Sequence, residues 1–172
     1  MYKTLKNSSV FFLGLIAFIA VYVNIVSAAT SATVTATVTA QNVSVSVSDG
    51  TVTYGTMSLS ALKNTTSTGL NDSQIASNDG NVTEDLNIRG QNTASWTLGA
   101  STAPDQYTHK FCNTDCDGSP TWTALTTSNQ TLTAGVTSSA TAPHFDLQIG
   151  IPSTSGSYTQ QSVDIIVQAS AS

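Results

Sequence analysis

Apolar and hydroxylated side chains alternate along residues 32–48, which read ATVTATVTAQNVSVSVS. The apolar positions are even-numbered up to Ala40 and odd-numbered from Val43 onward. A period of two is typical of a β-strand that buries one face and leaves the other in water. The phase changes at Gln41 and Asn42, where we expect a bulge or a strand break that restores the same facing. The whole run is about three times as long as an ordinary strand.

Turn residues and short apolar runs divide the rest of the chain. Asp49 and Gly50 predict a turn that joins the first run to a second strand over residues 51–59, so that the two form a hairpin. Residues 63–81 are rich in Asn, Asp, Ser, Thr and Gly, which predicts a loop with a short strand around Gln74. Further strands are expected over residues 82–89, 94–101, 106–111, 121–125, 130–134, 145–151 and 162–169.

Beyond residue 29, apolar residues nowhere recur at helical spacing for three turns. Roughly nine short strands with regular turn signals are typical of a sandwich or barrel. We therefore predict an all-β fold, a single antiparallel β-sandwich over residues 30–172, in which residues 30–41 form an extended edge or donor strand. The expected core comprises Val43, Val45, Val47, Val52, Leu86, Ile88, Trp96, Leu98, Phe111, Phe145, Leu147, Ile149, Val163, Ile165 and Val167.

Residues 1–29 have the order of a secretory signal peptide. Lys3 and Lys6 precede an apolar stretch over residues 10–26, and three small residues, SAA, follow it. We expect cleavage at or just before Thr30. An uncleaved anchor is the alternative, because the apolar stretch has the minimum length that spans a bilayer. Either reading places the domain outside the cytoplasm, extracellular or at the cell surface. With the expected cleavage, the protein contacts a membrane only during export.

Charged residues make up 9% of the chain, so its solubility depends on neutral polar side chains. Beyond residue 29 there are three basic residues, Lys63, Arg89 and Lys110, against ten acidic ones, a formal charge of −7. Such a domain repels nucleic acid and anionic membrane surfaces. We expect neither as a partner.

Cys112 and Cys116 are the two cysteines of the chain and lie in the stretch KFCNTDCDGSPTW. In an exported protein the pair predicts a disulfide that closes a small loop between two strands. The alternative is a metal site that adds Asp115, Asp117 and His109. A zinc site normally draws four ligands from two pairs, and a second Cys or His pair is absent, so the disulfide is favoured.

His109 and His144 are the two imidazoles of the chain, and no serine stands in a Gly-x-Ser-x-Gly setting. Because hydroxyl groups occur throughout, a serine, a histidine and an acid somewhere in the sequence are no evidence for a catalytic triad. We expect both histidines to be polar residues at strand ends, and we predict no catalytic residues, no enzymatic activity and no cofactor.

Three acidic residues, Asp79, Glu84 and Asp85, lie in the stretch NDGNVTED and could supply carboxylates to a calcium ion. The stretch lacks the regular acidic spacing of a defined calcium loop, and Asn-Asp-Gly also predicts a simple turn. These residues are therefore candidates for calcium binding, with a turn as the alternative.

Residues 89–98, RGQNTASWTL, resemble the proximal motif of WxL-domain surface proteins of Gram-positive bacteria, in which an Arg-Gly turn precedes a strand that begins with Trp-x-Leu. Residues 43–60 resemble the stretch before that motif, and residues 158–167 resemble the closing strand of the family. The distal Trp-x-Leu motif is absent, and Ile165 to Val167 occupy its region. The resemblance implies attachment to the cell wall, through peptidoglycan or another cell-surface partner.

Trp96 and Trp122 are the candidate ligand-contact aromatics that this resemblance indicates. Trp96 begins a strand with Leu98 on the same face, which by itself predicts a core side chain. Trp122 follows Pro120 and is expected to be the more exposed of the two.

Three functional hypotheses remain. The first is a non-enzymatic secreted or cell-surface structural or adhesive protein whose partner is a cell-envelope component or other copies of itself. In its specific form, residues 30–41 complete the sheet of the next copy, as in a filament. The second is a WxL-like peptidoglycan-binding module. The third is a small hydrolase or metalloprotein, which would need a polar cluster around His109, the cysteines or His144.

Overall fold

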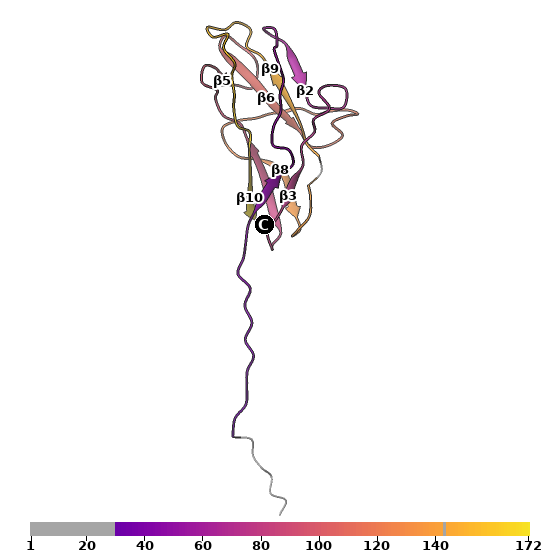
Figure 1. Cartoon of the computed structure of the whole chain (residues 1–172), viewed down its shortest axis with the longest axis vertical. Coiled ribbons are helices and arrows are strands. Elements are labelled where there is room, and N and C mark those ends of the chain that lie inside the picture. The colour runs from indigo at the N-terminus through magenta and orange to yellow at the C-terminus, as the bar shows by residue number, and fades with distance from the viewer. Residues whose placement is uncertain (1–29, 143) are drawn as a thin grey trace, which may run out of the picture. The chain divides into compact units, whose positions relative to one another are not determined.

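The structure, a computed structural model, describes residues 30–142 and 144–172. The expected signal peptide, residues 1–29, lies outside the described residues. The chain divides into two units, Met1–Val38 and Thr39–Ser172. In the described part of the first unit, residues 30–38 are extended chain with exposed side chains (Figure 1). No helix in the described part of the chain has the length and apolar character to cross a membrane.

The second unit is all-β, as predicted. Its described residues form ten strands and no helix. The strands are β1 (Val45–Val47), β2 (Leu62–Asn64), β3 (Ala76–Asn78), β4 (Glu84–Arg89), β5 (Thr97–Leu98), β6 (Gln106–Cys112), β7 (Thr123–Ala124), β8 (Gln130–Val136), β9 (Asp146–Gly150) and β10 (Ile166–Ala171).

The strands pair into small sheets that pack as a sandwich (Figure 1). One sheet is antiparallel, in the order β10-β4-β8. The larger sheet has the order β2-β9-β6-β5, in which β7 also pairs with β6 and the short β5–β6 pair is parallel. The β1–β3 pair lies beside the larger sheet, because isolated bridges join Gln74 to Phe145 and Ser77 to Thr141. Mixed pairing is thus confined to β5.

Side chains from both sheets form the core. Leu86 and Ile88 of β4 pack with Phe111 of β6, with Leu147 of β9 and with Phe145 just before β9. Most of the predicted core positions are confirmed, but Val43 is 40% exposed, and Trp96, Ile149 and Val163 are half-buried outside the core cluster. Five core residues were missing from the prediction: Ala76, Leu125, Leu132, Val136 and Ala142.

The predicted hairpin of residues 32–48 with residues 51–59 is wrong. β1 pairs with β3, in a region that the sequence predicted as mostly loop. Residues 49 and 50 both have positive φ, as a hairpin turn requires, but Gly50 N donates to Gln74 Oε1 and Ser48 N donates to Ile75 O. The ladder of β1 is therefore occupied by residues 75–78, and residues 51–59 continue without a partner strand.

The phase change at Gln41 and Asn42 marks a boundary between two segments, which agrees with the expected strand break and not with a bulge. Asn81 holds the chain there: its N–H donates to Asn42 O, its side-chain amide donates to Ala40 O, and its Oδ1 accepts from Asn42 N. Residues after this point follow β3, whereas residues 30–39 make no backbone hydrogen bond within the described chain. The even-numbered and the odd-numbered apolar positions therefore belong to two segments, one without backbone partners and one that pairs with β3.

Candidate functional site

A groove of about 1030 Å³ lies in the second unit. Two extended runs of chain, residues 50–59 and residues 157–165, form its walls. Neither run belongs to a strand, although both continue strands, the first after β1 and the second before β10 (Figure 1). The groove therefore lies between two extended runs that belong to no strand.

The first wall has free backbone groups and an apolar inner face. Within the described chain, residues 51–57 make no backbone-to-backbone hydrogen bond, and Lys63 Nζ donates to Tyr54 O. Val52 and Tyr54 are half-buried while their neighbours are exposed. Gly55, with φ of 72°, bends the chain so that the inward positions become odd-numbered at Met57.

The second wall has the same character. No backbone-to-backbone hydrogen bond involves residues 158–165 in the region that the structure describes. Gln161, Val163 and Ile165 are half-buried, and the exposed residues between them alternate with them up to β10. At the start of this wall Tyr158 is 81% exposed. The groove is thus bordered by two unpaired strand edges.

Side chains of β6 and β9 form the floor. Tyr107, Leu147 and Ile149 line it together with His109. Trp96 closes the surface beside Tyr107, at a ring separation of 6.4 Å, and Nε1 of this tryptophan donates to Ser155 Oγ at 2.8 Å. The floor is therefore mostly aromatic and aliphatic.

His109 is the polar group of this floor, and burial controls its charge. Its side chain is 3% exposed, Nε2 lies 3.1 Å from the Tyr54 hydroxyl, and Nδ1 has no partner. Burial lowers the pKa of His109 to about 4 and raises the pKa of Tyr107 to about 12. Burial, with Asp72 and Asp146, also raises the pKa of Tyr54. All three rings are neutral at pH 7, so they add no charge to the groove, and Asp164 is the charged residue of its lining.

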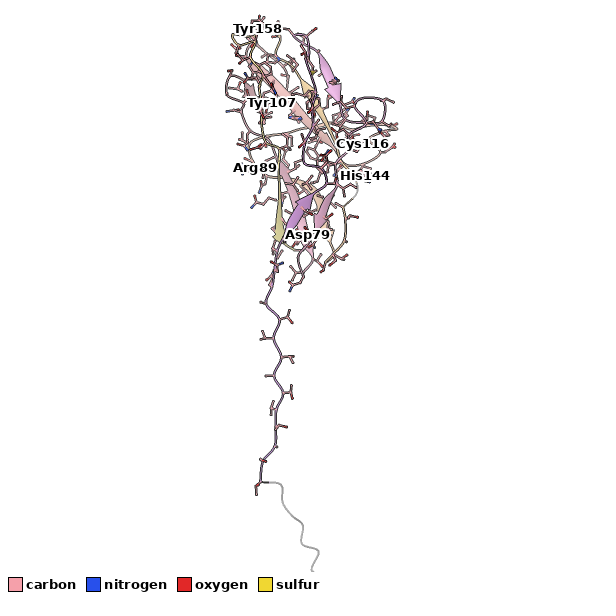
Figure 2. All side chains as sticks on the ribbon, viewed as in Figure 1. Asp79, Arg89, Tyr107, Cys116, His144 and Tyr158 are labelled. Atoms are coloured by element: carbon pink, nitrogen blue, oxygen red, sulfur yellow. A yellow bond between two sulfur atoms is a disulfide. The ribbon has the colours of Figure 1, made fainter. Side chains whose placement is uncertain are left out.

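The two histidines lie in different places, and one of them contradicts its prediction. His109 is in the middle of β6 and buried, so it is not a polar strand-end residue, because the strand extends to Cys112 and both its ends are elsewhere. His144 is exposed and precedes β9. It lines a second hollow beside Cys116 (Figure 2) and does not line the groove.

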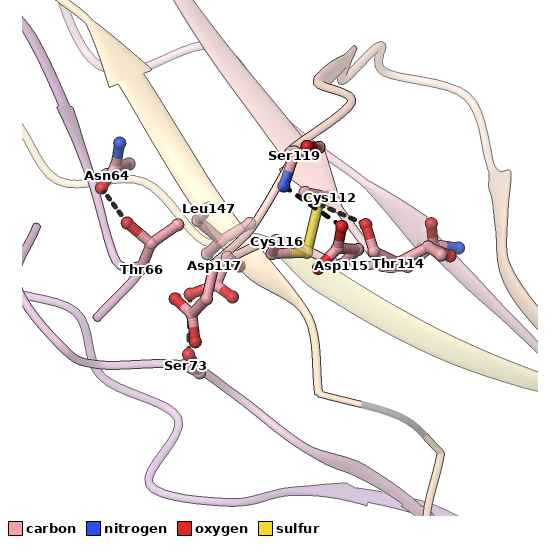
Figure 3. The surroundings of a disulfide bond; sticks show 12 residues. Asn64, Thr66, Ser73, Cys112, Thr114, Asp115, Cys116, Asp117, Ser119 and Leu147 are labelled. Atoms are coloured by element: carbon pink, nitrogen blue, oxygen red, sulfur yellow. Dashed lines mark hydrogen bonds between the residues drawn. A yellow bond between two sulfur atoms is a disulfide. The ribbon is translucent and has the colours of Figure 1, made fainter. Parts of the chain in front are cut away.

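The predicted disulfide between Cys112 and Cys116 is confirmed (Figure 3). It closes the loop after β6, in which Asp115 Oδ2 accepts from Ser119 N. Asp117 accepts from Ser67 N at 2.7 Å, and this hydrogen bond lowers the pKa of its carboxyl. The loop borders the second hollow, of about 400 Å³.

The candidate metal ligands do not converge. In the described ranges no group of three His, Cys, Asp or Glu side chains is placed to hold a metal ion. Glu84 is fully buried and its Oε1 accepts from Ser44 N, whereas Asp85 points to the opposite face of β4 and accepts from Gly135 N. Asp79 lies in a turn at the end of the body opposite Tyr158 (Figure 2).

The two tryptophans are both half-buried, so the expected contrast in their exposure is not found. Trp96 lines the groove, and Trp122 lines neither hollow. The Arg-Gly turn before Trp96 has a packing role, because a Cβ at Gly90 would lie 2.7 Å from Leu98 Cδ2. Gly90 and Leu98 of the motif therefore fit against each other.

No protein-family model, curated protein or solved structure matches this chain. Its candidate site therefore depends on its own geometry.

The groove was not predicted from the sequence. Both of its walls were expected to be strands with partners, since residues 51–59 and 162–169 have the right composition. The number of alternating apolar runs in the sequence could have revealed it, because there are more such runs than neighbouring strands to pair with them. Tyr107 and His109 were missed as floor residues because β6 is buried but carries polar groups on its side chains. Its sequence therefore does not alternate clearly between apolar and polar residues.

Proposed function

We propose that this protein is an exported, non-enzymatic structural subunit at the cell surface that assembles with copies of itself through residues 30–41. One observation carries the proposal: the side chains of Val34 and Val38 are 94% and 96% exposed, on a segment of strictly alternating strand pattern. Such a pattern requires a sheet, and the described part of the protein provides no partner strand for it.

The energetics favour association. Fully burying a valine side chain contributes roughly 1.5–2 kcal/mol, so the two exposed valines alone offer about 3–4 kcal/mol to a partner that covers them. Unpaired backbone groups on both edges of an extended segment are a template for strand addition. Residues 30–41 contain no charged residue and no proline, the usual devices that block edge pairing.

Composition and the expected export signal support the location. A chain with 9% charged residues and a Ser/Thr-rich surface suits a protein held by contacts with neighbours outside the cytoplasm. The partners in this proposal are other copies, or a cell-envelope component to which the assembly is attached.

Deletion of residues 30–41 tests the assembly. The expected result is that purified protein beginning at Thr30 forms elongated particles in electron microscopy and light scattering, while the shortened protein stays monomeric and folded. A matched control keeps the length and replaces Thr33, Thr35, Thr37 and Thr39 by serine, which leaves the apolar positions intact and should preserve assembly. Identical particles with and without the segment would refute the proposal.

Cell-wall binding is the second candidate function, favoured by the WxL-like motif and by the position of Trp96 at the groove surface. A pull-down on purified peptidoglycan separates it from self-assembly. Binding that survives deletion of residues 30–41 and falls with Trp96→Ala would favour the wall-binding module.

A further inference from the structure

We propose that the groove between residues 50–59 and residues 157–165 is the acceptor site for residues 32–40 of a second copy of this chain. The inference deepens the proposed self-assembly and rests on it. It says which surface receives the segment, which face of the segment points into the groove, and that the segment comes from another molecule.

Backbone hydrogen bonding supports the assignment. Each wall presents N–H and C=O groups that no other strand in the described chain uses. A strand inserted between the walls could pair with both, which would join β1 and β10 through a continuous sheet. Each wall and the incoming segment are about ten residues long, about 33 Å at 3.3 Å per residue, so the lengths agree.

The side chains agree as well. The inward face of the segment consists of alanine and valine at even positions, which are small enough to enter between two walls. They would meet Val52 and Met57 on one wall, Val163 and Ile165 on the other, and the neutral floor around Tyr107. The outward face is threonine, which is suited to the exposed side of a sheet. The segment would bring no charge into the groove, because residues 30–41 carry none, and Asp164, the charged residue of the lining, is exposed.

A protein cannot place these residues in its own groove. Residues 42–48 run beside residues 75–81, and the groove lining begins at Val47. A segment that reversed at Asn42 would need about five residues, about 17 Å, to come back to Val47, in addition to the residues of the turn itself. The residues used for the turn and the return would lie outside the groove, so the whole of 32–40 would not fit in it. A second copy has no such restriction, so the occupant is another molecule.

A charge placed inside the groove tests the acceptor in the full chain. Val163→Arg puts a guanidinium among apolar side chains on the inner face, and Gln168→Arg puts the same charge on the exposed face of β10, which continues that wall. We expect Val163→Arg to raise the protein concentration needed for assembly about tenfold or more, and Gln168→Arg to leave it unchanged. Normal assembly of a folded Val163→Arg protein would overturn the acceptor assignment while leaving the proposed function intact.

Photo-crosslinking tests the acceptor assignment even if the Val163→Arg protein does not fold. Val38 is replaced by p-benzoylphenylalanine, and isotopically light and heavy copies are mixed before irradiation. Crosslinks between light and heavy chains that map to residues 50–59 or 157–167 support the inference. Crosslinks within one chain, crosslinks to another surface, or none in assembled particles would overturn it. Loss of assembly on deleting residues 30–41 is measured in parallel, so failure of the acceptor assignment and failure of self-assembly are distinguished.

Discussion

The Tyr54 hydroxyl lies 3.1 Å from Nε2 of His109, so a side-chain hydrogen bond fastens one wall of the groove to its floor. The backbone of that wall meanwhile remains unpaired in the described structure. The wall is therefore held in position by its side chains while its backbone groups stay free for another strand.

Acidification should destabilise the fold through His109. Its folded pKa of about 4 is below the ordinary value of 6.5, so between these values the unfolded chain binds a proton that the folded chain does not. The contribution of neutral His109 to the free energy of unfolding is fully present above pH 6.5. It is lost as the pH decreases towards 4, by up to about 3 kcal/mol. Urea denaturation from pH 7 to pH 4.5 measures it, and His109→Gln should flatten the dependence. Equal slopes in both proteins would assign the titration to another group.

Removal of the disulfide should weaken the second unit without unfolding it. Cys112 and Cys116 are four positions apart, so the closed loop is small and its constraint on the unfolded chain contributes about 2 kcal/mol. For a unit of this size the expected fall in Tm is about 7 °C, in both the reduced protein and the Cys112→Ala/Cys116→Ala variant. Circular dichroism during heating checks it. Loss of the β-sheet signal at room temperature after reduction would contradict the expectation.

Asn78→Ala should be among the more destabilising substitutions. The buried Asn78 amide donates to Val82 O and Val136 O and accepts from Gly80 N, each at 2.8 Å. Its loss leaves three backbone groups without that partner, at a cost of about 3–5 kcal/mol in the free energy of unfolding. Asn129→Ala is the control, since its amide makes one exposed contact, and it should change stability by less than about 0.5 kcal/mol. Similar effects of the two substitutions would refute this role.

Gly90→Ala should destabilise by overpacking. The added methyl group would lie 2.7 Å from Leu98 Cδ2 and 3.3 Å from Leu125 Cβ, so the neighbours must move, at about 1–3 kcal/mol. Chemical denaturation of Gly90→Ala, Leu98→Ala and the double variant measures the coupling between the two positions. We expect the double variant to lose less stability than the sum of the single variants. Strict additivity would show that Leu98 is not what restricts position 90.

The sequence carried the local information well. Turn residues and short apolar runs predicted β6 and β9 to within a residue or two, and spacing with an expected export signal predicted the disulfide. Pairing was less accessible, because an alternating run shows which face is buried and not which strand lies beside it. β3 was hidden for this reason: its buried residues, Ala76 and Asn78, are a small side chain and a polar one, and neither carries an apolar signal.

The groove could be recognised only in three dimensions. Residues 51–57 have the composition of a strand, and their lack of a partner follows from Gln74 and Ile75 occupying the edge at Ser48 to Gly50. The burial that lowers the pKa of His109 likewise depends on packing between distant segments, which no local pattern contains. By contrast, the unusual length of the first alternating run already indicated that it is not one ordinary strand, and residues 30–38 belong to a separate unit.

The ladder between residues 42–48 and residues 75–81 has a mechanical consequence. In the proposed assembly, a pull on residues 30–41 would travel along one uninterrupted backbone, through Asn42 and β1, to the wall that grips the next molecule. Its hydrogen bonds lie perpendicular to the strand, so tension would load them together in shear and would not peel them apart one by one. A fibre made in this way would resist stretching along its axis with no flexible loop in the path of the force.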